Sequence, residues 1–207
     1  MLLEILVVTI FSYTCGSIPF GLILTKIFLG KDVRKIGSGN IGATNVLRTG
    51  NKYIAIITLL LDISKGFIPV IISQEFFPDY VHLSGLLTFL GHLFPIWLNF
   101  KGGKGVATYL GVLIGLSIEL SILFVFTWIV TTLIFKYSSV SSIFSTLTVF
   151  IISFLTELSR KIIKFSNSNL NDDSNAIILF IFLIIIIFTH KKNISNLKYK
   201  KENKIKL

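Results

Sequence analysis

The sequence predicts an all-α integral membrane protein with seven transmembrane helices in a single domain, residues 1–207. Of its 207 residues, 53% are hydrophobic and 14% are charged, whereas a typical soluble domain is about 25% charged. The mean hydropathy is +0.81. Apolar residues also occur in long runs, such as Ala176–Phe188. Runs of this kind are typical of helices that cross a bilayer, and they leave no room for a soluble module.

Seven apolar segments are expected to cross the membrane. The first follows a start that carries Glu4 but no early Lys or Arg. A cleaved signal peptide needs a positively charged start, so we expect this segment to be retained as a helix. The fourth and fifth are short for a span of roughly 17–25 residues, and we expect two helices that meet near Glu119 in place of one bent unit. The segments are 3–29, 53–73, 81–98, 105–118, 120–135, 140–157 and 175–189.

The distribution of basic residues predicts the orientation of these segments. A net charge of +10 would suggest nucleic acid in a soluble protein. In a membrane protein, Lys and Arg collect in the cytoplasmic loops. We therefore expect no nucleic-acid partner, an outside N-terminus and a cytoplasmic C-terminus, since six spans would place the last two segments on the wrong faces. With seven spans, 16 of the 20 basic residues fall inside, in segments 26–52, 99–104, 136–139 and 190–207.

Several features carry no assigned chemistry. The single cysteine, Cys15, allows no intrachain disulfide and no Cys-x-x-Cys metal site. The polar stretch Ser166–Asp173 is expected to be a loop. The Lys-rich tail 196–207 is expected to set orientation and to contact anionic lipid. Gly111 and Gly115 indicate close helix packing.

Four polar stretches interrupt the apolar segments on the expected cytoplasmic side, and we call them the inner-face breaks. The first, residues 37–48, is rich in glycine and small polar residues. It reads GSGNIGATNVLR. Glycines permit positive φ and a close approach of the backbone to a ligand, and successive N–H groups can form an anion-binding nest. Thr44 or Asn45 could cap a short helix, and Arg48 offers a planar fork suited to phosphate. These residues alone leave a flexible re-entrant loop as the alternative.

The second inner-face break combines Gly91–Pro95 (GHLFP) with Phe100–Thr108 (FKGGKGVAT). It is only superficially similar to a nucleotide P-loop. That motif needs an earlier glycine, a Ser or Thr after the Lys, and a preceding strand, whereas here Gly105 follows Lys104. The glycines around Lys104 would still allow its ammonium to meet an anion. A positively charged inner turn is the alternative.

The third and fourth breaks carry hydroxyl, imidazole and amide groups. Lys136–Ser142 reads KYSSVSS, and its hydroxyls could simply cap a helix. Thr189–Asn193 reads THKKN, and His190 and Asn193 share a face if the helix continues. An interfacial histidine without a catalytic role is the alternative.

Together, the four breaks predict a receptacle for one or two phosphate groups at the cytoplasmic surface. Irregular backbone at membrane depth persists only where it is buried in protein or lines a wet cavity, and a phosphate site meets that condition.

These motifs resemble those of the bacterial acyl-phosphate-dependent glycerol-3-phosphate acyltransferases, over nearly the whole chain. The chain departs from the family pattern at Lys136 and Thr189, where Arg is usual, and at Lys200, where Gly is common. Glu202 falls where the C-terminal signature ends in an acid. The matching stretches are Ser38–Asn45, Gly91–Pro95 with Phe100–Thr108, Ser139–Ser142 and His190–Ile194.

The resemblance implies a multi-pass enzyme of the bacterial inner membrane with its active site on the cytoplasmic face. It would transfer a fatty acyl group from acyl phosphate to the sn-1 hydroxyl of glycerol 3-phosphate. The products would be lysophosphatidic acid and inorganic phosphate, in phospholipid biosynthesis. No metal or organic cofactor is implied, and the enzyme that makes acyl phosphate is a candidate partner.

Roles for individual residues follow from this resemblance and from the chemistry of two phosphorylated substrates. We expect the Ser38–Asn45 loop to cradle the donor phosphate, and Arg48, Lys104, Ser142 and Asn193 to grip glycerol 3-phosphate. His190 would orient a phosphate or assist proton transfer. The candidate catalytic residues are Ser38, Arg48, Lys104 and His190. The candidate substrate-binding residues are Gly39, Asn40, Gly42, Thr44, Asn45, Gly102, Gly103, Gly105, Ser139, Ser142 and Asn193.

Two other classes of function remain open at this point. A transporter or flippase of a phosphorylated lipid precursor would also use broken helices and a basic cavity. It predicts polar groups in the outer half of the spans and an internal repeat, and neither is evident. A non-catalytic binder of anionic lipid would explain the basic tail but not the glycine-rich breaks.

Three further ionisable residues are left outside the site. Acyl-CoA-dependent enzymes of this kind use His-x-x-x-x-Asp, and no histidine here has an Asp five residues later. That absence favours the acyl-phosphate type, and His92, within Gly91–Pro95, is interpreted as structural. Asp62 and Lys65 lie three apart on one face of the second segment, where an ionisable pair is either functional or mutually neutralising.

Overall fold

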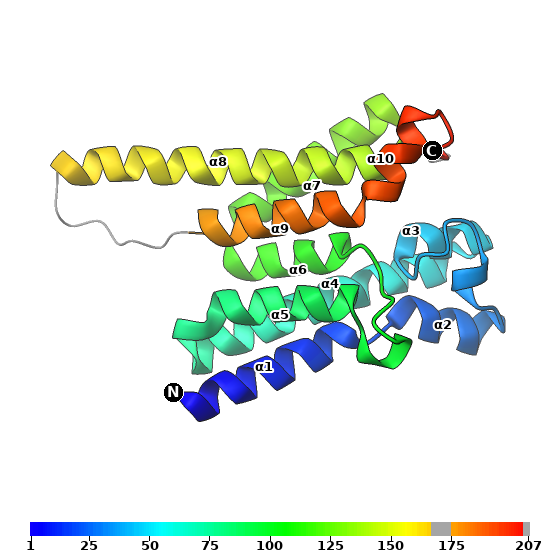
Figure 1. Ribbon diagram of the computed structural model, residues 1–207, viewed down its shortest axis with the longest axis horizontal. Helices are drawn as coiled ribbons and strands as arrows, with labels where there is room; N and C mark the ends of the chain where they lie inside the picture. The colour runs from blue at the N-terminus through cyan, green and yellow to red at the C-terminus, as the bar shows by residue number, and fades with distance from the viewer. Residues whose placement is uncertain (167–174, 205–207) are drawn as a thin grey trace. The chain divides into compact units, whose positions relative to one another are not determined.

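The computed structural model describes residues 1–166 and 175–204, which are helical with no strand among them (Figure 1). Apart from its first residue, the predicted loop Ser166–Asp173 lies outside these residues. The all-α prediction is confirmed for the described chain. The α-helices are α1 (Leu2–Ser17), α2 (Phe20–Leu29), α3 (Ala43–Val46), α4 (Lys52–Phe76), α5 (Val81–Leu93), α6 (Val106–Leu116), α7 (Ile118–Phe135), α8 (Ser138–Ser166), α9 (Ala176–Thr189) and α10 (Lys191–Lys198).

The chain divides into two compact units, Met1–Leu116 and Ser117–Leu207. The first unit contains α1 to α6, and the second contains α7 to α10. The single domain expected over 1–207 stays a prediction.

Five helical stretches are long and apolar enough to cross a membrane, and α9 with α10 gives a sixth if this pair, bent by 54°, is one span. The 11-residue α6 falls short, because at 1.5 Å per residue it covers about half of a hydrocarbon core roughly 30 Å thick. A multi-pass helical membrane protein is thus confirmed, and the seventh span stays a prediction. The five stretches are Leu2–Leu29, Lys52–Phe76, Pro78–Leu98, Ile118–Phe135 and Ser138–Ile162.

Two of the expected segments are interrupted or bounded by identifiable residues. The first is broken between α1 and α2 at Ile18 and Pro19, as expected where a proline cannot donate a helical hydrogen bond. The fourth and fifth are separate helices that meet near Glu119, as predicted, and the boundary between them is Ser117. The Ser117 hydroxyl accepts a hydrogen bond from the Leu120 N–H at 3.2 Å and caps α7, which satisfies one of the unpaired donors of a helix start.

Glycines allow the helices of the first unit to approach closely. α4 packs against α6, and α1 lies along α5 (Figure 1). A Cβ on Gly111 of α6 would collide with the Ile63 carbonyl of α4, and one on Gly66 with the Thr108 carbonyl. A Cβ on Gly115 would collide with the Val70 side chain. The close packing predicted at Gly111 and Gly115 is confirmed, as in other small-residue helix contacts in membranes.

The second unit is joined by hydroxyl groups at one end of α7 and α8. The Thr132 and Ser141 hydroxyls are 2.8 Å apart, and Trp128 Nε1 donates to the Ser142 hydroxyl at 3.3 Å. Such interhelical hydrogen bonds fix the register of neighbouring membrane helices.

We predict that Gly111→Ala destabilises the protein by about 1–3 kcal/mol, the typical effect of overpacking, because the added methyl meets backbone that cannot move aside. Thermal unfolding in detergent measures this. Gly42→Ala is the matched control, since its Cβ would come no closer than 3.7 Å to another residue. Equal melting temperatures for the two variants would contradict the close α4–α6 contact.

Candidate functional site

The amide of Asn45 organises the first connector, residues 30–51 between α2 and α4. Its side chain is buried, Oδ1 accepts from the Ser38 N–H at 2.9 Å, and Nδ2 lies 2.7–3.0 Å from three carbonyl oxygens of the same connector. The helix cap expected from Thr44 or Asn45 is wrong, because the cap of α3 is Gly42 and no side chain bonds there. The Asn45 amide is engaged with backbone on both sides, so it shapes the connector, and its predicted contact with substrate stays a prediction.

Other parts of the predicted nest are also used internally. The Gly39 N–H donates to the Ile36 carbonyl at 2.9 Å, and the Gly42 N–H to Asn40 Oδ1 at 3.1 Å. Gly37 and Gly39 have φ of 54° and 74°, so they are the positions where glycine is required. The connector therefore has a fixed shape and fewer backbone donors to offer than a nest model assumes.

The hydroxyls and the cation of this connector do reach its surface. Ser38, Thr44 and Arg48 are exposed, and no hydrogen bond of the Ser38 or Thr44 hydroxyl is recorded within residues 1–166 and 175–204. The Arg48 side chain lies against Gly37, which precedes Ser38. Two hydroxyls and one guanidinium therefore face outward from a connector whose backbone is held from within.

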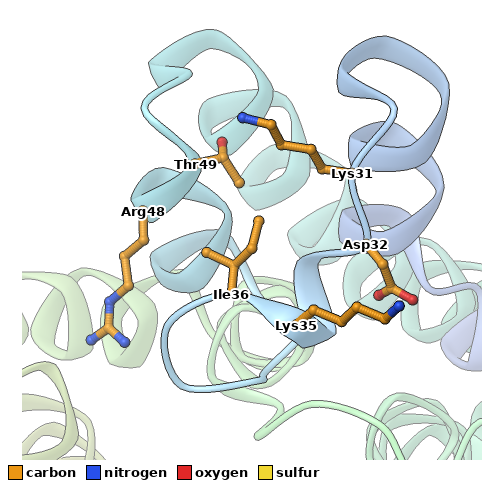
Figure 2. A pocket seen from close by; sticks show the side chains of 6 residues that line it. All are labelled: Lys31, Asp32, Lys35, Ile36, Arg48 and Thr49. Atoms are coloured by element: carbon orange, nitrogen blue, oxygen red, sulfur yellow. The ribbon is translucent and has the colours of Figure 1, made fainter.

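A basic groove adjoins these residues (Figure 2). Its acid, Asp32, accepts hydrogen bonds from Arg34 at 2.7–2.9 Å, and this pairing lowers the pKa of the Asp32 carboxyl to about 2. Arg34 thus neutralises the only acidic side chain in the groove lining, whose remaining charges are cationic and attract anions. The lining residues are Lys31, Asp32, Lys35, Ile36, Arg48 and Thr49.

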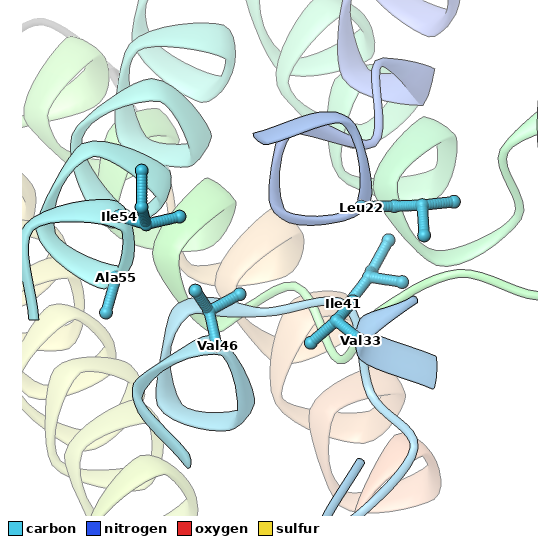
Figure 3. Packing of buried hydrophobic residues seen from close by; sticks show 6 residues of the cluster. All are labelled: Leu22, Val33, Ile41, Val46, Ile54 and Ala55. Atoms are coloured by element: carbon cyan, nitrogen blue, oxygen red, sulfur yellow. The ribbon is translucent and has the colours of Figure 1, made fainter. Parts of the chain in front are cut away.

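An apolar cluster packs the first connector against its neighbouring helices (Figure 3). It joins α2, the connector and the start of α4, and Leu98 of the second connector packs against it. Gly21 of α2 lies so close to the Ile41 carbonyl that a side chain there would collide. Both connectors of the first unit thus rest on one core. The cluster consists of Leu22, Val33, Ile41, Val46, Ile54 and Ala55.

The second connector, residues 94–105, folds back onto the end of α5. The Gly102 N–H donates to the Leu93 carbonyl at 3.0 Å, and the Gly103 N–H to the His92 carbonyl at 3.1 Å, which satisfies carbonyls that a helix end leaves unpaired. Side chains at Gly102 and Gly103 would collide with α5. These glycines serve close packing, and their N–H groups are not directed at a ligand.

Lys104 lies between two tightly packed glycines. Gly103 packs against the His92 ring, and Gly105, with φ of 82°, packs against the Phe89 ring. Lys104 is half-buried. Its position is therefore set by the end of α5 and not by a mobile turn.

A charged cluster lies beneath this connector inside the first unit. Asp62 Oδ1 of α4 is 2.8 Å from Lys65 Nζ and 3.8 Å from His92 Nδ1 of α5, and each side chain is 2–3% exposed. Asp62 and Lys65 form a close ion pair within one helix. The predicted pairing of Asp62 with Lys65 is confirmed, and the involvement of His92 was not foreseen.

In the second unit, the candidate residues Ser139 and Asn193 both contact Glu202, whose role the sequence left open. Glu202 accepts hydrogen bonds from the Ser139 hydroxyl at 3.3 Å and from Asn193 Nδ2. The Ser142 hydroxyl donates to the Ser138 carbonyl at 2.8 Å. The single acid in a Lys-rich tail is the sequence signal that could have identified Glu202.

His190 marks the bend between α9 and α10. It is buried, and its Nδ1 lies 2.8 Å from the Ile186 carbonyl. A carbonyl only accepts, so Nδ1 carries the proton. His190 lies outside both helices and Asn193 lies in the first turn of α10, so they do not share one continuous helix face. The convergence of the four inner-face breaks on one pocket stays a prediction, because the breaks belong to two different units.

Comparison with known proteins places this arrangement in a family. The model of the family described as glycerol-3-phosphate acyltransferase matches residues 6–200. A glycerol-3-phosphate acyltransferase of Pelagibacter ubique is 50% identical over 205 residues, 99% of this chain and 100% of the relative. One of Brucella anthropi is 46% identical over 196 residues, 95% of this chain and 90% of the relative.

Two solved structures are similar over nearly the same length. They are crystal structures of PlsY, an integral membrane glycerol 3-phosphate acyltransferase, in glycerol 3-phosphate and lysophosphatidic acid forms. Their TM-scores are 0.86 and 0.83 at 33% and 32% identity, with 98% of this chain and 96% and 95% of those chains covered. With its helical membrane fold and glycine-rich connectors, the chain belongs to the glycerol-3-phosphate acyltransferase family.

Proposed function

We propose that this membrane acyltransferase takes its acyl group from a fatty acyl phosphate and transfers it to the sn-1 hydroxyl of glycerol 3-phosphate. The products are lysophosphatidic acid and inorganic phosphate. The observation that carries the proposal is the outward-facing set of Ser38, Thr44 and Arg48, held on an internally satisfied connector. Its groups suit a phosphate, and acyl phosphate and glycerol 3-phosphate each carry one.

The chemistry needs positioning more than activation. Acyl phosphate is a mixed anhydride, so the substrate hydroxyl attacks the acyl carbon, the bond from that carbon to the phosphate oxygen breaks, and phosphate leaves. The hydroxyl proton passes to a phosphate oxygen, and no covalent enzyme intermediate is required. Holding two reactants in a reactive geometry can lower the barrier by roughly 7–11 kcal/mol in well-oriented cases.

The residues divide between the two phosphates. Ser38 and Thr44 donate to the donor phosphate, while Arg48 offers a bidentate fork and Lys104 a point charge to glycerol 3-phosphate. In the second unit, Ser142 and Asn193 are assigned to glycerol 3-phosphate, and His190 orients a phosphate or assists proton transfer. Asn45 acts by shaping the first connector, and Glu202 by holding Ser139 and Asn193.

The membrane topology belongs to the same proposal. Seven spans with an outside N-terminus would put the four inner-face breaks on the cytoplasmic face of a bacterial inner membrane. This is the face where the basic residues concentrate. The short helices α6 and α9 count as spans in this arrangement. The enzyme that makes acyl phosphate remains a candidate partner, and the domain is taken as one unit of function over 1–207.

The donor is tested with purified protein in detergent. We predict phosphate release from palmitoyl phosphate that depends on glycerol 3-phosphate, with equimolar lysophosphatidic acid formed. Palmitoyl-CoA in place of palmitoyl phosphate is expected to give no product. Acylation from palmitoyl-CoA alone would overturn the acyl-phosphate donor while leaving the family assignment intact.

The acceptor site is tested at Lys104. We predict that Lys104→Ala raises KM for glycerol 3-phosphate roughly 10- to 100-fold, because a hydrogen bond to a charged group contributes about 1.5–3 kcal/mol. Steady-state kinetics measure this. Lys101→Ala, an exposed lysine in the same connector, is the matched control and should leave KM near wild type. An unchanged KM in a folded Lys104→Ala protein would remove Lys104 from the site.

The topology is tested by cysteine labelling, which is convenient because Cys15 is the only cysteine. In a Cys15→Ser background, we predict that Glu75→Cys reacts with an impermeant maleimide in intact spheroplasts. Lys198→Cys should react only after the membrane is opened. Both positions are exposed in the structure. Labelling of both in intact spheroplasts would place the C-terminus outside and contradict the proposed orientation.

A further inference from the structure

The proposed chemistry does not use the ion pair inside α4. Asp62 and Lys65 are each 2% exposed within the first unit, and charges placed so deep in a membrane helix are costly. A well-packed apolar pair of similar volume is often as stable as a buried ion pair, or more stable. Stability alone therefore does not account for the two charges, and their directional contacts need a separate explanation.

Lys65 reaches from α4 to the break between α1 and α2. Its Nζ donates a hydrogen bond to the Ile18 carbonyl at 2.6 Å and lies 5.6 Å from the centroid of the Phe20 ring. Ile18 is the cap residue that follows the end of α1, and Phe20 is the first residue of α2. Lys65 therefore fixes the point and direction at which α2 leaves α1.

The direction of α2 in turn sets the first connector. Gly21, next to Phe20, is packed against the Ile41 carbonyl of the connector. Leu22 belongs to the apolar cluster that joins α2 to the connector. A displacement of the start of α2 would therefore shift the first connector, which carries Ser38 and Thr44.

Asp62 acts in the other direction, toward α5. Its carboxylate is 3.8 Å from His92 Nδ1, a buried nitrogen for which the described residues provide no hydrogen-bond partner. The His92 carbonyl holds the Gly103 N–H, and the His92 ring packs directly against Gly103. The second connector therefore packs on His92, and Asp62 is the charged group next to the His92 ring.

We propose that the Asp62–Lys65 pair is a positioning device that holds both glycine-rich connectors of the first unit in register. It acts through Ile18 and His92 and touches no substrate. The two arms have separate targets: Lys65 sets the first connector, and Asp62 sets the second, which carries Lys104. This inference rests on the proposed function for the substrates assigned to Ser38, Thr44, Arg48 and Lys104.

The decisive variant replaces both charges by apolar residues, Asp62→Leu/Lys65→Met. It leaves no unpaired buried charge, so we expect a melting temperature near wild type. We expect kcat/KM to fall by about 10- to 100-fold, because misplacing a reacting group by about 1 Å can reduce the rate roughly 100-fold. A double variant with wild-type stability and wild-type kinetics would overturn the proposal.

Glu157→Gln/Lys161→Met is the matched control. It removes another ion pair within one helix, at 2.9 Å in α8 of the second unit, where neither glycine-rich connector lies. Both its stability and its kinetics should stay near wild type. A similar kinetic loss in this control would show that removing any helical ion pair impairs the enzyme, and would overturn the specific role of Asp62 and Lys65.

The single variants separate positioning from a purely structural role. Asp62→Asn keeps the contact of Lys65 with Ile18 and should raise KM for glycerol 3-phosphate more than KM for palmitoyl phosphate. Lys65→Met should raise KM for palmitoyl phosphate through Ser38 and Thr44, and also KM for glycerol 3-phosphate through Arg48, because all three lie on the first connector. An unchanged KM for palmitoyl phosphate in Lys65→Met, or equal changes in both constants in Asp62→Asn, would overturn the assignment of one arm to each connector. Failure of the double variant and of Asp62→Asn to fold would assign the pair to stability and overturn the proposal as well.

Binding of glycerol 3-phosphate alone keeps this test separate from the identity of the donor. Calorimetry on Asp62→Asn should show weaker binding than on wild type, by about 10-fold, whatever the acyl donor is. Wild-type protein that binds glycerol 3-phosphate but does not use palmitoyl phosphate would end the donor proposal only. Unchanged binding by Asp62→Asn, with wild type active, would end the positioning proposal only.

Discussion

The first unit is governed by the need to satisfy backbone polar groups wherever a membrane helix stops. Hydrocarbon offers no hydrogen-bond partner, so every break in a helix must be completed by protein or by water. The break after α1 is met by Lys65, whose ammonium binds the Ile18 carbonyl. The end of α5 is met by the N–H groups of Gly102 and Gly103. The connector after α2 is closed by Asn45, which bonds one N–H and three carbonyls.

This constraint changes the role of the glycines. A nest that binds an anion needs successive N–H groups left open, yet five of the relevant donors are occupied, at Ser38, Gly39, Gly42, Gly102 and Gly103. The glycines instead let the connectors fold tightly against α5 and against Asn45. The charge of a bound phosphate then falls to side chains, namely the hydroxyls and cations that a rigid backbone presents. Rigid presentation also suits a reaction whose barrier is lowered mainly by geometry.

The sequence predicts local features well and tertiary partners poorly. Long apolar runs identify the helices because lipid requires them, and Asp62 and Lys65 pair because they lie three apart on one helix. The boundary predicted near Glu119 lies at Ser117, where the serine side chain caps α7. The part that Asn45 plays in shaping the connector could not be predicted, because its three carbonyl partners, on Val33, Ile36 and Asn40, converge only once the connector is folded. The partners of the ion pair, Ile18 and His92, are 44 and 30 residues from Asp62 along the chain, so no local pattern could reveal them.

Electrostatics explains why a fixed set of cations is needed at all. Both proposed substrates are anionic, and two unit charges about 4 Å apart interact by about 4 kcal/mol at the effective dielectric constant of 20 found near protein surfaces. Bringing two phosphates into contact therefore costs a large part of what positioning gains, unless cations are already in place. Arg34 removes the one opposing charge from the basic groove by pairing with Asp32, and Lys31, Lys35 and Arg48 remain. A mobile set of lysines would have to be ordered at each turnover. In connectors packed on one apolar core, the conformational entropy of ordering these residues is already lost during folding. The packing inside the first unit therefore affects a reaction at its surface.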